Sequence, residues 1–206
     1  MSPYQSAIDH LSRHDPVLAQ VIANYKQPDF KPHGNYYQAL VDSIISQQLS
    51  VKAAASIEKR FKDSFGGDFP SPQQILERDI EQLRSLGLSR PKASYIQDLA
   101  AKIIDGTVEF STIDTLSNDE IIAELTKVKG IGEWTAHMFL LFCMGRSDVL
   151  PTGDLGIRNG IKLLYGFDQP PTPDDVRNIA TKNKWHPYES VASWYIWQSL
   201  DNAPKL

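Results

Sequence analysis

Two segments of the chain carry the residues that could do chemistry. The first, LTKVKGIGEWTA (residues 125–136), contains a turn, KGIG (residues 129–132), between two predicted helices. The second, DVLPTGDLGIR (residues 148–158), contains the carboxylate of Asp154. A glycine turn that leads into a helix presents unpaired N–H groups, which suit a phosphate oxygen. A carboxylate stabilises the positive charge that develops on a sugar when an N-glycosidic bond breaks.

Each feature also has a plainer interpretation. A dinucleotide-binding turn would need a preceding strand and a third glycine, but here a helix precedes the turn and position 135 is threonine. A tight turn between helices that binds no ligand is a second alternative. Asp154 by itself could simply cap the helix that follows it. Asp148 is the nearest competing carboxylate.

Taken together, the two segments resemble the helix-hairpin-helix, Gly-Pro-Asp superfamily of DNA glycosylases, and within it the 3-methyladenine DNA glycosylase II branch. Two further segments, ALVDSIISQQLSVKAA (residues 39–54) and LGLSRPKASYI (residues 86–96), are also similar to that branch. The resemblance implies an enzyme that excises alkylated purines, such as 3-methyladenine and 7-methylguanine. Such an enzyme initiates base excision repair of alkylated DNA.

The resemblance also assigns roles around the bond that is cut. Asp154 corresponds to the catalytic aspartate, and Asp148 to a structural acid. Bifunctional members carry a lysine nucleophile where this chain has Trp134, so the resemblance implies a monofunctional hydrolase that leaves an abasic site. Three alternatives stay open: a glycosylase with lyase activity, a different range of lesions, and a catalytically silent module that binds DNA structure.

Duplex DNA hides its glycosidic bonds, so the target nucleotide must be flipped out of the stack. By the resemblance, Gln48 fills the gap as a wedge, with Leu49 as the next candidate. Trp134, Tyr188 and Met138 would line the base pocket, and Met138 stands where some members carry tyrosine. The faces of aromatic rings attract a cationic alkylated base. The alternative for the wedge residues is an ordinary connection between two helices, and the alternative for the aromatic residues is a place in the core. We expect the core role for Trp185, Trp194 and Trp197.

The resemblance further implies how the hairpin holds DNA. The residues that it assigns to phosphate binding are Lys127, Lys129, Gly130, Ile131, Gly132 and Thr135. It also implies that the carbonyl oxygens of Thr126, Val128 and Ile131 bind a sodium or potassium ion that bridges to a phosphate. No other cofactor is expected.

Composition limits the remaining classes. The 206 residues carry a net charge of −4, which argues against coating nucleic acid by bulk charge but allows a local DNA-binding face. Cys143 is the single cysteine, which excludes an internal disulfide and an iron–sulfur cluster held by four thiolates. We expect a monomer that binds double-stranded DNA containing alkylated bases and does not bind a membrane. Its expected location is intracellular: the cytoplasm or nucleoid of a prokaryote, or the nucleus of a eukaryote.

The hydrophobic pattern is helical almost throughout and predicts an all-α, two-lobed helical bundle. We expect one compact unit over residues 1–206, with a first lobe over 35–115 and the helix-hairpin-helix lobe over 116–180. The N-terminal segment and a last helix over 187–201 would pack alongside. Helical spacing links Tyr37, Leu40, Val41, Ile44, Ile45 and Leu49, and residues 47–49 lie between this predicted helix and the next. Capping signals and apolar spacing start other helices near Asp15-Pro16, Ser50, Ser71-Pro72, Ile80, 91, Ser117, Glu133, Asp154, Asp174 and Tyr188.

Overall fold

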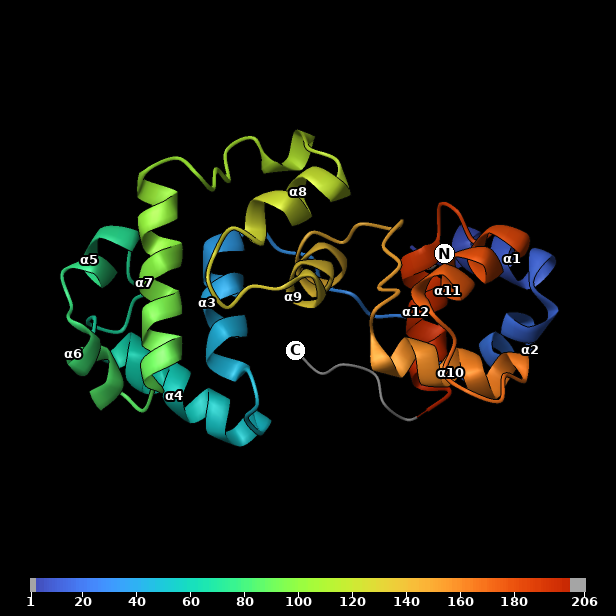
Figure 1. Cartoon of the computed structure of the whole chain (residues 1–206), viewed down its shortest axis with the longest axis horizontal. Helices are drawn as coiled ribbons and strands as arrows, with labels where there is room; N and C mark the ends of the chain where they lie inside the picture. Colours follow the sequence, from blue (N-terminus) through green and yellow to red (C-terminus); the bar gives the residue numbers. More distant parts are fainter. Residues whose placement is uncertain (1–2, 201–206) are drawn as a thin grey trace. The chain divides into compact units, whose positions relative to one another are not determined.

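The structure, a computed structural model, describes residues 3–200 and contains helices but no strand within that range (Figure 1). The prediction of an all-α protein is therefore confirmed. The described residues form two compact units, one of residues 33–139 and one of residues 3–32 together with 140–200. Within residues 3–200, no helix has the length and apolar character that crossing a bilayer requires.

This division differs from the predicted one. The lobe boundary expected at 115/116 does not separate the units, because the hairpin and the helices on either side of it belong with residues 33–114. Hydrogen bonds from the hairpin to a preceding helix and turn, described below, account for this. The predicted last helix is confirmed as α12 (Glu189–Gln198), and residue 201 of the predicted span lies outside the described residues.

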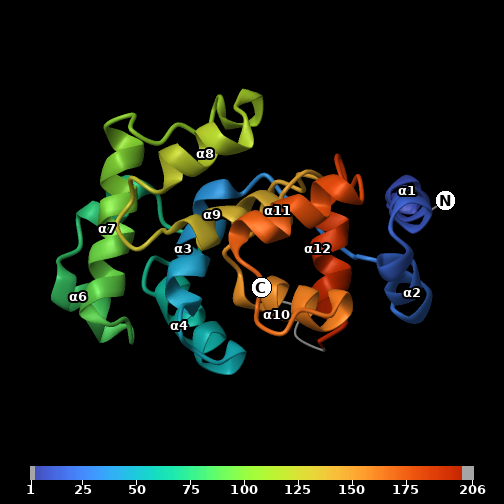
Figure 2. The same ribbon diagram turned by 45° about the vertical axis from the view of Figure 1, so that its right-hand side comes forward.

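The unit of residues 33–139 is built on two helices, α3 and α7 (Figure 2). Helix α7 contacts α3, α5 and α6, while α3 also contacts α4, and α8 contacts α9. Leu40 and Ile44 of α3 and Ile96 and Leu99 of α7 are completely buried. The helices are α3 (Tyr36–Ser46), α4 (Val51–Asp63), α5 (Pro72–Leu76), α6 (Ile80–Ser85), α7 (Arg90–Ile104), the 3-10 turn η1 (Ile113–Thr115), α8 (Asn118–Leu125) and α9 (Glu133–Met138).

Side-chain caps fix where most of these helices begin. The hydroxyl of Ser50 accepts the N–H of Ala53 at the start of α4, and the hydroxyl of Ser89 accepts the N–H of Lys92 at the start of α7. Ser117 forms the predicted capping box with Glu120 at the start of α8. The sequence therefore sets the starts of α4, α7 and α8 through local capping side chains.

The second unit combines the two ends of the described chain. Its α12 contacts α1, α2 and α10, and Trp185, Tyr195 and Trp197 are almost fully buried. The core role expected for Trp185 and Trp197 is confirmed. Helix α1 was not predicted, since Ala7 and Leu11 are its only buried residues. The helices are α1 (Gln5–His14), α2 (Pro16–Asn24), α10 (Leu155–Tyr165), α11 (Pro173–Lys182) and α12. The π-helical segment η2 (Phe139–Cys143) comes before α10, and within it the chain leaves one unit and enters the other.

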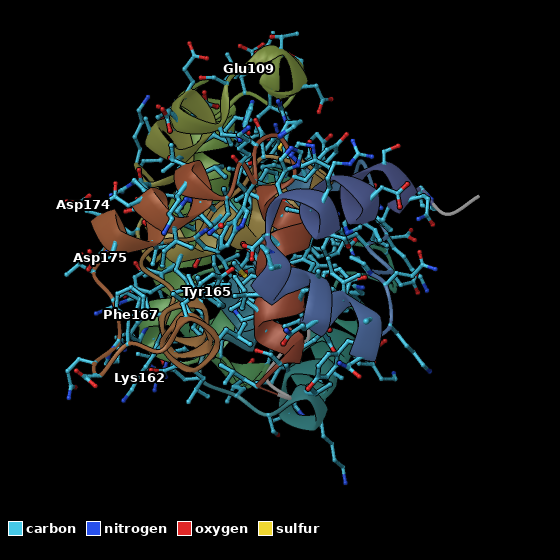
Figure 3. All side chains as sticks on the ribbon, turned by 90° about the vertical axis from the view of Figure 1, so that its right-hand side faces the viewer. Glu109, Lys162, Tyr165, Phe167, Asp174 and Asp175 are labelled. Atoms are coloured by element: carbon cyan, nitrogen blue, oxygen red, sulfur yellow. The ribbon has the colours of Figure 1, made fainter. Side chains whose placement is uncertain are left out.

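A buried carboxylate joins the two parts of this unit. Asp15 has no exposed surface, and its Oδ1 accepts the backbone N–H groups of Val17 and Leu18 at 3.0 Å each. Its Oδ2 accepts the hydroxyl of Tyr165 at 2.6 Å and the indole N–H of Trp185 at 2.7 Å (Tyr165 is labelled in Figure 3). Both oxygens therefore have donors, as a buried anion requires. Burial and the neighbouring Asp15 raise the pKa of Tyr165, so its hydroxyl keeps the proton that it donates.

Asp15→Ala is expected to lower the free energy of unfolding by roughly 3–5 kcal/mol, because it leaves buried donors without an acceptor. Urea titration followed by circular dichroism measures the change. The control is Asp174→Ala, which removes an exposed carboxylate in the first turn of α11 (Figure 3) and should change stability little. Equal losses in the two variants would show that Asp15 does not hold the unit together.

Candidate functional site

Hydrogen bonds from the backbone of α10 and from the indole of Trp197 hold Asp154 at the start of α10. Its side chain is the N-cap of that helix, and Oδ1 accepts the N–H of Ile157 at 2.7 Å. The same oxygen accepts the indole N–H of Trp197 at 2.8 Å. The residue is 9% exposed, so the carboxylate lies at the boundary between the core and the surface. Capping and a chemical role are thus compatible, because the cap fixes the carboxylate's orientation.

Two glycines allow Trp197 to reach Asp154. A Cβ atom at Gly156 would lie 3.0 Å from Oδ1 of Asp154 and 3.0 Å from Cδ1 of Trp197. A Cβ atom at Gly160, one turn later, would lie 2.4 Å from Cγ2 of Ile196. Helices α10 and α12 can approach this closely only because both positions lack a side chain. The sequence reasoning missed Trp197 and both glycines, although their spacing of four residues places the glycines on one face of α10.

The segment that leads to Asp154 is tied to the start of α12. The hydroxyl of Ser190 donates to the carbonyl of Arg146 at 2.6 Å and accepts the N–H of Val149 at 3.1 Å. The N–H of Ser190 donates to the carbonyl of Ser147 at 2.9 Å. Asp148 lies in this segment with its side chain exposed, in contrast to Asp154. Of the two carboxylates, only Asp154 is both partly buried and the N-cap of a helix.

Tyr188, a predicted pocket residue, lies in the same unit as Asp154. It is half-buried and directly precedes α12. The ring of His10 meets it edge to face, with 5.2 Å between the ring centroids. His10 is itself fixed by a 2.6 Å hydrogen bond between its Nε2 and the carbonyl of Lys184. His10 and Lys184 were not predicted to contribute, since they lie 174 residues apart and no local pattern joins them.

The other predicted residues lie in the unit of residues 33–139, where the hairpin joins α8 to α9. Gly130 has φ +82°, a left-handed conformation that suits glycine, and Gly132 is the N-cap of α9. Ile131 is 4% exposed, so its side chain plugs the core as expected. Lys127 and Lys129 are exposed, whereas Thr135 is buried, so its side chain is directed into the unit rather than toward solvent.

Trp134 and Met138, both on α9, have different environments. Trp134 is 47% exposed, which is unusual for so large an apolar side chain. Met138 is 2% exposed and belongs to the core of its unit. Of the two predicted pocket residues on this helix, only Trp134 therefore offers a large surface to solvent.

The side chains of Asp98 in α7 and of Gln47, the C-cap of α3, hold the hairpin turn. Oδ2 of Asp98 accepts the backbone N–H of Lys129 at 2.8 Å, and the amide of Gln47 donates to the carbonyl of Gly130 at 2.8 Å. Burial opposes ionisation of Asp98, but hydrogen bonds from Lys102 and from the Lys129 backbone lower its pKa overall. The tip of the turn leaves no space, since a Cβ atom at Gly130 would lie 2.1 Å from the ring of Tyr95.

The predicted wedge residues lie in the turn between α3 and α4. Gln48 is exposed and has φ +57°, a left-handed conformation that is uncommon for a residue other than glycine. Leu49, the second candidate, is 39% exposed. The turn thus presents both side chains on the surface.

The carbonyl oxygens predicted to hold a monovalent cation all lie in the hairpin. Thr126 is the C-cap of α8, and the carbonyl of Val128 accepts the N–H of Ile131 at 3.1 Å. A carbonyl oxygen has two lone pairs, so this hydrogen bond leaves Val128 able to coordinate an ion. Neutral carbonyl oxygens are ligands that alkali-metal ions accept. The donor set fits sodium or potassium.

Comparison with known proteins identifies the family. Residues 41–185 match the model of the HhH-GPD superfamily base excision DNA repair proteins. The chain is 36% identical over 184 residues to DNA-3-methyladenine glycosylase 1 of Schizosaccharomyces pombe, an alignment that covers 88% of this chain and 80% of that protein. The chain therefore belongs to the HhH-GPD superfamily, as its sequence motifs predicted.

Solved structures show the same fold. A 3-methyladenine DNA glycosylase of Schizosaccharomyces pombe in complex with abasic DNA matches with a TM-score of 0.78 and 35% identity, over 98% of this chain and 100% of that one. A DNA-3-methyladenine glycosidase of Bacillus halodurans matches with a TM-score of 0.84 and 35% identity, over 96% of this chain and 89% of that one. Each covers nearly the whole length of both chains.

Gly130→Ala is expected to destabilise the protein by roughly 2–4 kcal/mol, since it adds a left-handed alanine and a clash with Tyr95. Gly132→Ala is the matched control, because Gly132 has φ −96° and a Cβ atom added there would meet no other atom within 4 Å. Thermal unfolding of both variants measures the difference. If Gly132→Ala destabilised the protein as much as Gly130→Ala, the packing of the turn on Tyr95 would be unimportant.

Proposed function

We propose that the protein is a monofunctional DNA glycosylase that hydrolyses the N-glycosidic bond of alkylated purines, including 3-methyladenine and 7-methylguanine, and so initiates base excision repair. The observation that carries the proposal is the fixed carboxylate of Asp154 in a chain of this superfamily. The 3-methyladenine glycosylases that match over most of their own length support the substrate class.

The chemistry needs one well-placed anion. As the bond from the sugar C1′ to the purine nitrogen breaks, the base leaves with the electron pair and positive charge grows on the sugar. Asp154 stabilises that charge and orients a water molecule, whose oxygen bonds to C1′ while its proton is released. The donors from Ile157 and Trp197 prevent the carboxylate from rotating away, so little reorganisation is needed in the transition state.

One carboxylate suffices when the leaving group is already activated. A purine alkylated on a ring nitrogen carries a positive charge before the bond breaks and leaves as a neutral base. The electron-rich faces of Trp134 and Tyr188 would attract such a cation more strongly than an unmodified base. Trp134 also stands where a lyase would need its lysine, which supports hydrolysis without strand cleavage.

Double-stranded DNA containing alkylated bases is the proposed partner, bound by a monomer. The hairpin would hold a phosphate with its backbone N–H groups, assisted by Lys127 and Lys129, and a sodium or potassium ion on its carbonyl oxygens would bridge to the same backbone. Gln48, in its exposed left-handed conformation, would fill the gap left by the flipped nucleotide. The enzyme would act wherever the cell keeps its DNA.

Asp154→Asn is expected to slow release of methylpurines from methylated duplex DNA by ~100-fold or more, equivalent to ~2.7 kcal/mol of transition-state stabilisation. Single-turnover assays that count free base and abasic sites measure the change. Asp174→Asn is the control and should retain most of the activity, since Asp174 is an exposed carboxylate in the first turn of α11. If neither the wild type nor Asp154→Asn releases base while both bind abasic DNA, the protein is a DNA-structure-binding module.

Borohydride treatment of the same reactions tests the other alternative. A hydrolase without a Schiff-base intermediate leaves the abasic strand intact and forms no covalent adduct with DNA. A trapped adduct would contradict the monofunctional mechanism. Release of oxidised or deaminated bases in preference to methylpurines would change the proposed range of lesions.

Trp197→Phe is expected to slow base release about tenfold, because Asp154 loses an indole donor that orients it. Tyr195→Phe, which alters a buried aromatic residue of the same helix, should affect the rate much less. The rate should recover little when substrate is raised to saturation, since the loss lies in the chemical step. A variant that matched the wild type at saturation would show that Trp197 does not position the carboxylate.

A further inference from the structure

Helix α7 has three residues on one face that contact other segments of its unit. Lys92, Tyr95 and Asp98 follow one another at intervals of three, so their side chains project from neighbouring positions of the helix surface. Lys92 contacts the turn after α3, while Tyr95 and Asp98 contact the hairpin. One helix therefore holds both turns that the proposed function assigns to DNA.

Lys92 fixes the turn that carries Gln48. Its ammonium donates to the carbonyl of Ile45 at 2.9 Å and to the carbonyl of Gln47 at 2.5 Å. These carbonyls lie at the C-terminal end of α3, where helix carbonyls lack intrahelical partners and a positive charge is favourable. Burial lowers the pKa of Lys92, so the two acceptors offset a desolvation cost that an exposed lysine would not have.

The contact matters because the next residue has an unfavourable backbone. Gln48 at φ +57° costs ~1 kcal/mol or more for a residue other than glycine, and such a conformation persists only where its surroundings impose it. The hydrogen bond to the carbonyl of Gln47 lies immediately before this residue. Without Lys92, the turn is expected to relax, and the side chain of Gln48 would point elsewhere.

Asp98 fixes the hairpin in a corresponding way. Its Oδ2 accepts the N–H of Lys129 at 2.8 Å and the ammonium of Lys102 at 2.7 Å, and the side chain is 14% exposed. The hydrogen bond from Gln47 to the carbonyl of Gly130 then connects the two turns directly. The turns are thus joined twice, once through α7 and once through Gln47.

We infer that α7 is a rigid spacer that sets the distance between the wedge turn and the phosphate-binding hairpin, with Lys92 and Asp98 as positioning residues. From Lys92 to Asp98 the helix rises ~9 Å, a separation that an α-helix holds far more firmly than a loop. Flipping requires the wedge to enter the stack at a fixed place relative to the phosphate that the hairpin holds. The inference rests on the proposed function.

The first test is Lys92→Met, which keeps an unbranched side chain of nearly the same length and removes its N–H donors. With a methylpurine paired in duplex DNA, base release should slow about tenfold or more. With the same lesion unpaired in a bulge, the loss should be twofold or less, because the cost of unpairing is absent and the wedge is needed less. A 2-aminopurine beside an abasic-site analogue should likewise show a smaller rise in fluorescence with the variant than with the wild type.

The second test is Asp98→Ala, which should weaken binding to duplex DNA about tenfold, with or without a lesion. A purely electrostatic role predicts the opposite, because removing a negative charge beside Lys129 would tighten binding. The ratio of activity on paired and unpaired lesions should stay at the wild-type value. Lys59→Met and Asp63→Ala are the matched controls, since they break an exposed ion pair elsewhere in the same unit and should leave every readout unchanged.

Three results would overturn the inference. Lys92→Met could slow release equally from paired and unpaired lesions, or it could reduce the salt dependence of binding by about one phosphate contact, which would make Lys92 a DNA ligand. Asp98→Ala could bind as tightly as the wild type or tighter. If Lys92→Met does not fold, Lys92→Gln keeps an uncharged N–H donor group on a shorter side chain, and its paired-to-unpaired ratio should lie between those expected for the wild type and for Lys92→Met.

The fluorescence and binding measurements do not require catalysis. If the wild type releases no methylpurine but the rise in 2-aminopurine fluorescence is still smaller with Lys92→Met than with the wild type, the proposed substrate is wrong and the role of α7 as a spacer is supported. If the wild type is active and both variants behave as their controls do, the spacer is wrong and the proposed function stands.

Discussion

The hydrogen bond from a tryptophan indole to a helix-capping carboxylate occurs twice in the unit of residues 3–32 and 140–200, and the unit depends on both. Trp185 donates to Asp15, and Trp197 donates to Asp154. Asp15 is completely buried with donors on both oxygens, so it serves as an anchor. Asp154 is 9% exposed, and its Oδ1 accepts both the backbone N–H of Ile157 and the indole N–H of Trp197. One arrangement thus anchors the fold at one position and, at the other, orients the carboxylate to which we assign the proposed chemistry.

The unit of residues 33–139 follows a different rule, in which backbone rather than side-chain atoms are held in place. Its two candidate DNA-binding turns contain left-handed residues, Gln48 and Gly130, and both are fixed by polar side chains of α7 and, at the hairpin, of Gln47. Backbone groups can meet a phosphate only when their directions are fixed beforehand. The polar residues of α7 are therefore as important to the proposed interface as the exposed lysines.

The sequence predicted the helical fold, most helix starts and the superfamily, because caps and apolar spacing are local signals. Ser117 and Asp174 are examples, since each lies at or near the helix start that it indicated. The sequence did not predict the boundary between the two units, nor the residues whose hydrogen bonds hold the candidate site in place. The contact of Trp197 with Asp154 spans 43 residues, and that of Lys129 with Asp98 spans 31. Such contacts depend on tertiary packing, which neither periodicity nor capping motifs encode.

The anchor at Asp15 has a consequence for the order in which the protein assembles during synthesis. Its partners Tyr165 and Trp185 follow it by 150 and 170 residues, so they leave the ribosome long after α1 and α2. All of residues 33–139 emerge in the interval. Until then Asp15 has its local donors, Val17 and Leu18, but lacks the two distant ones, and closing so long a loop is slow. The unit that carries Asp154 can therefore be completed only after Trp185 has been synthesised.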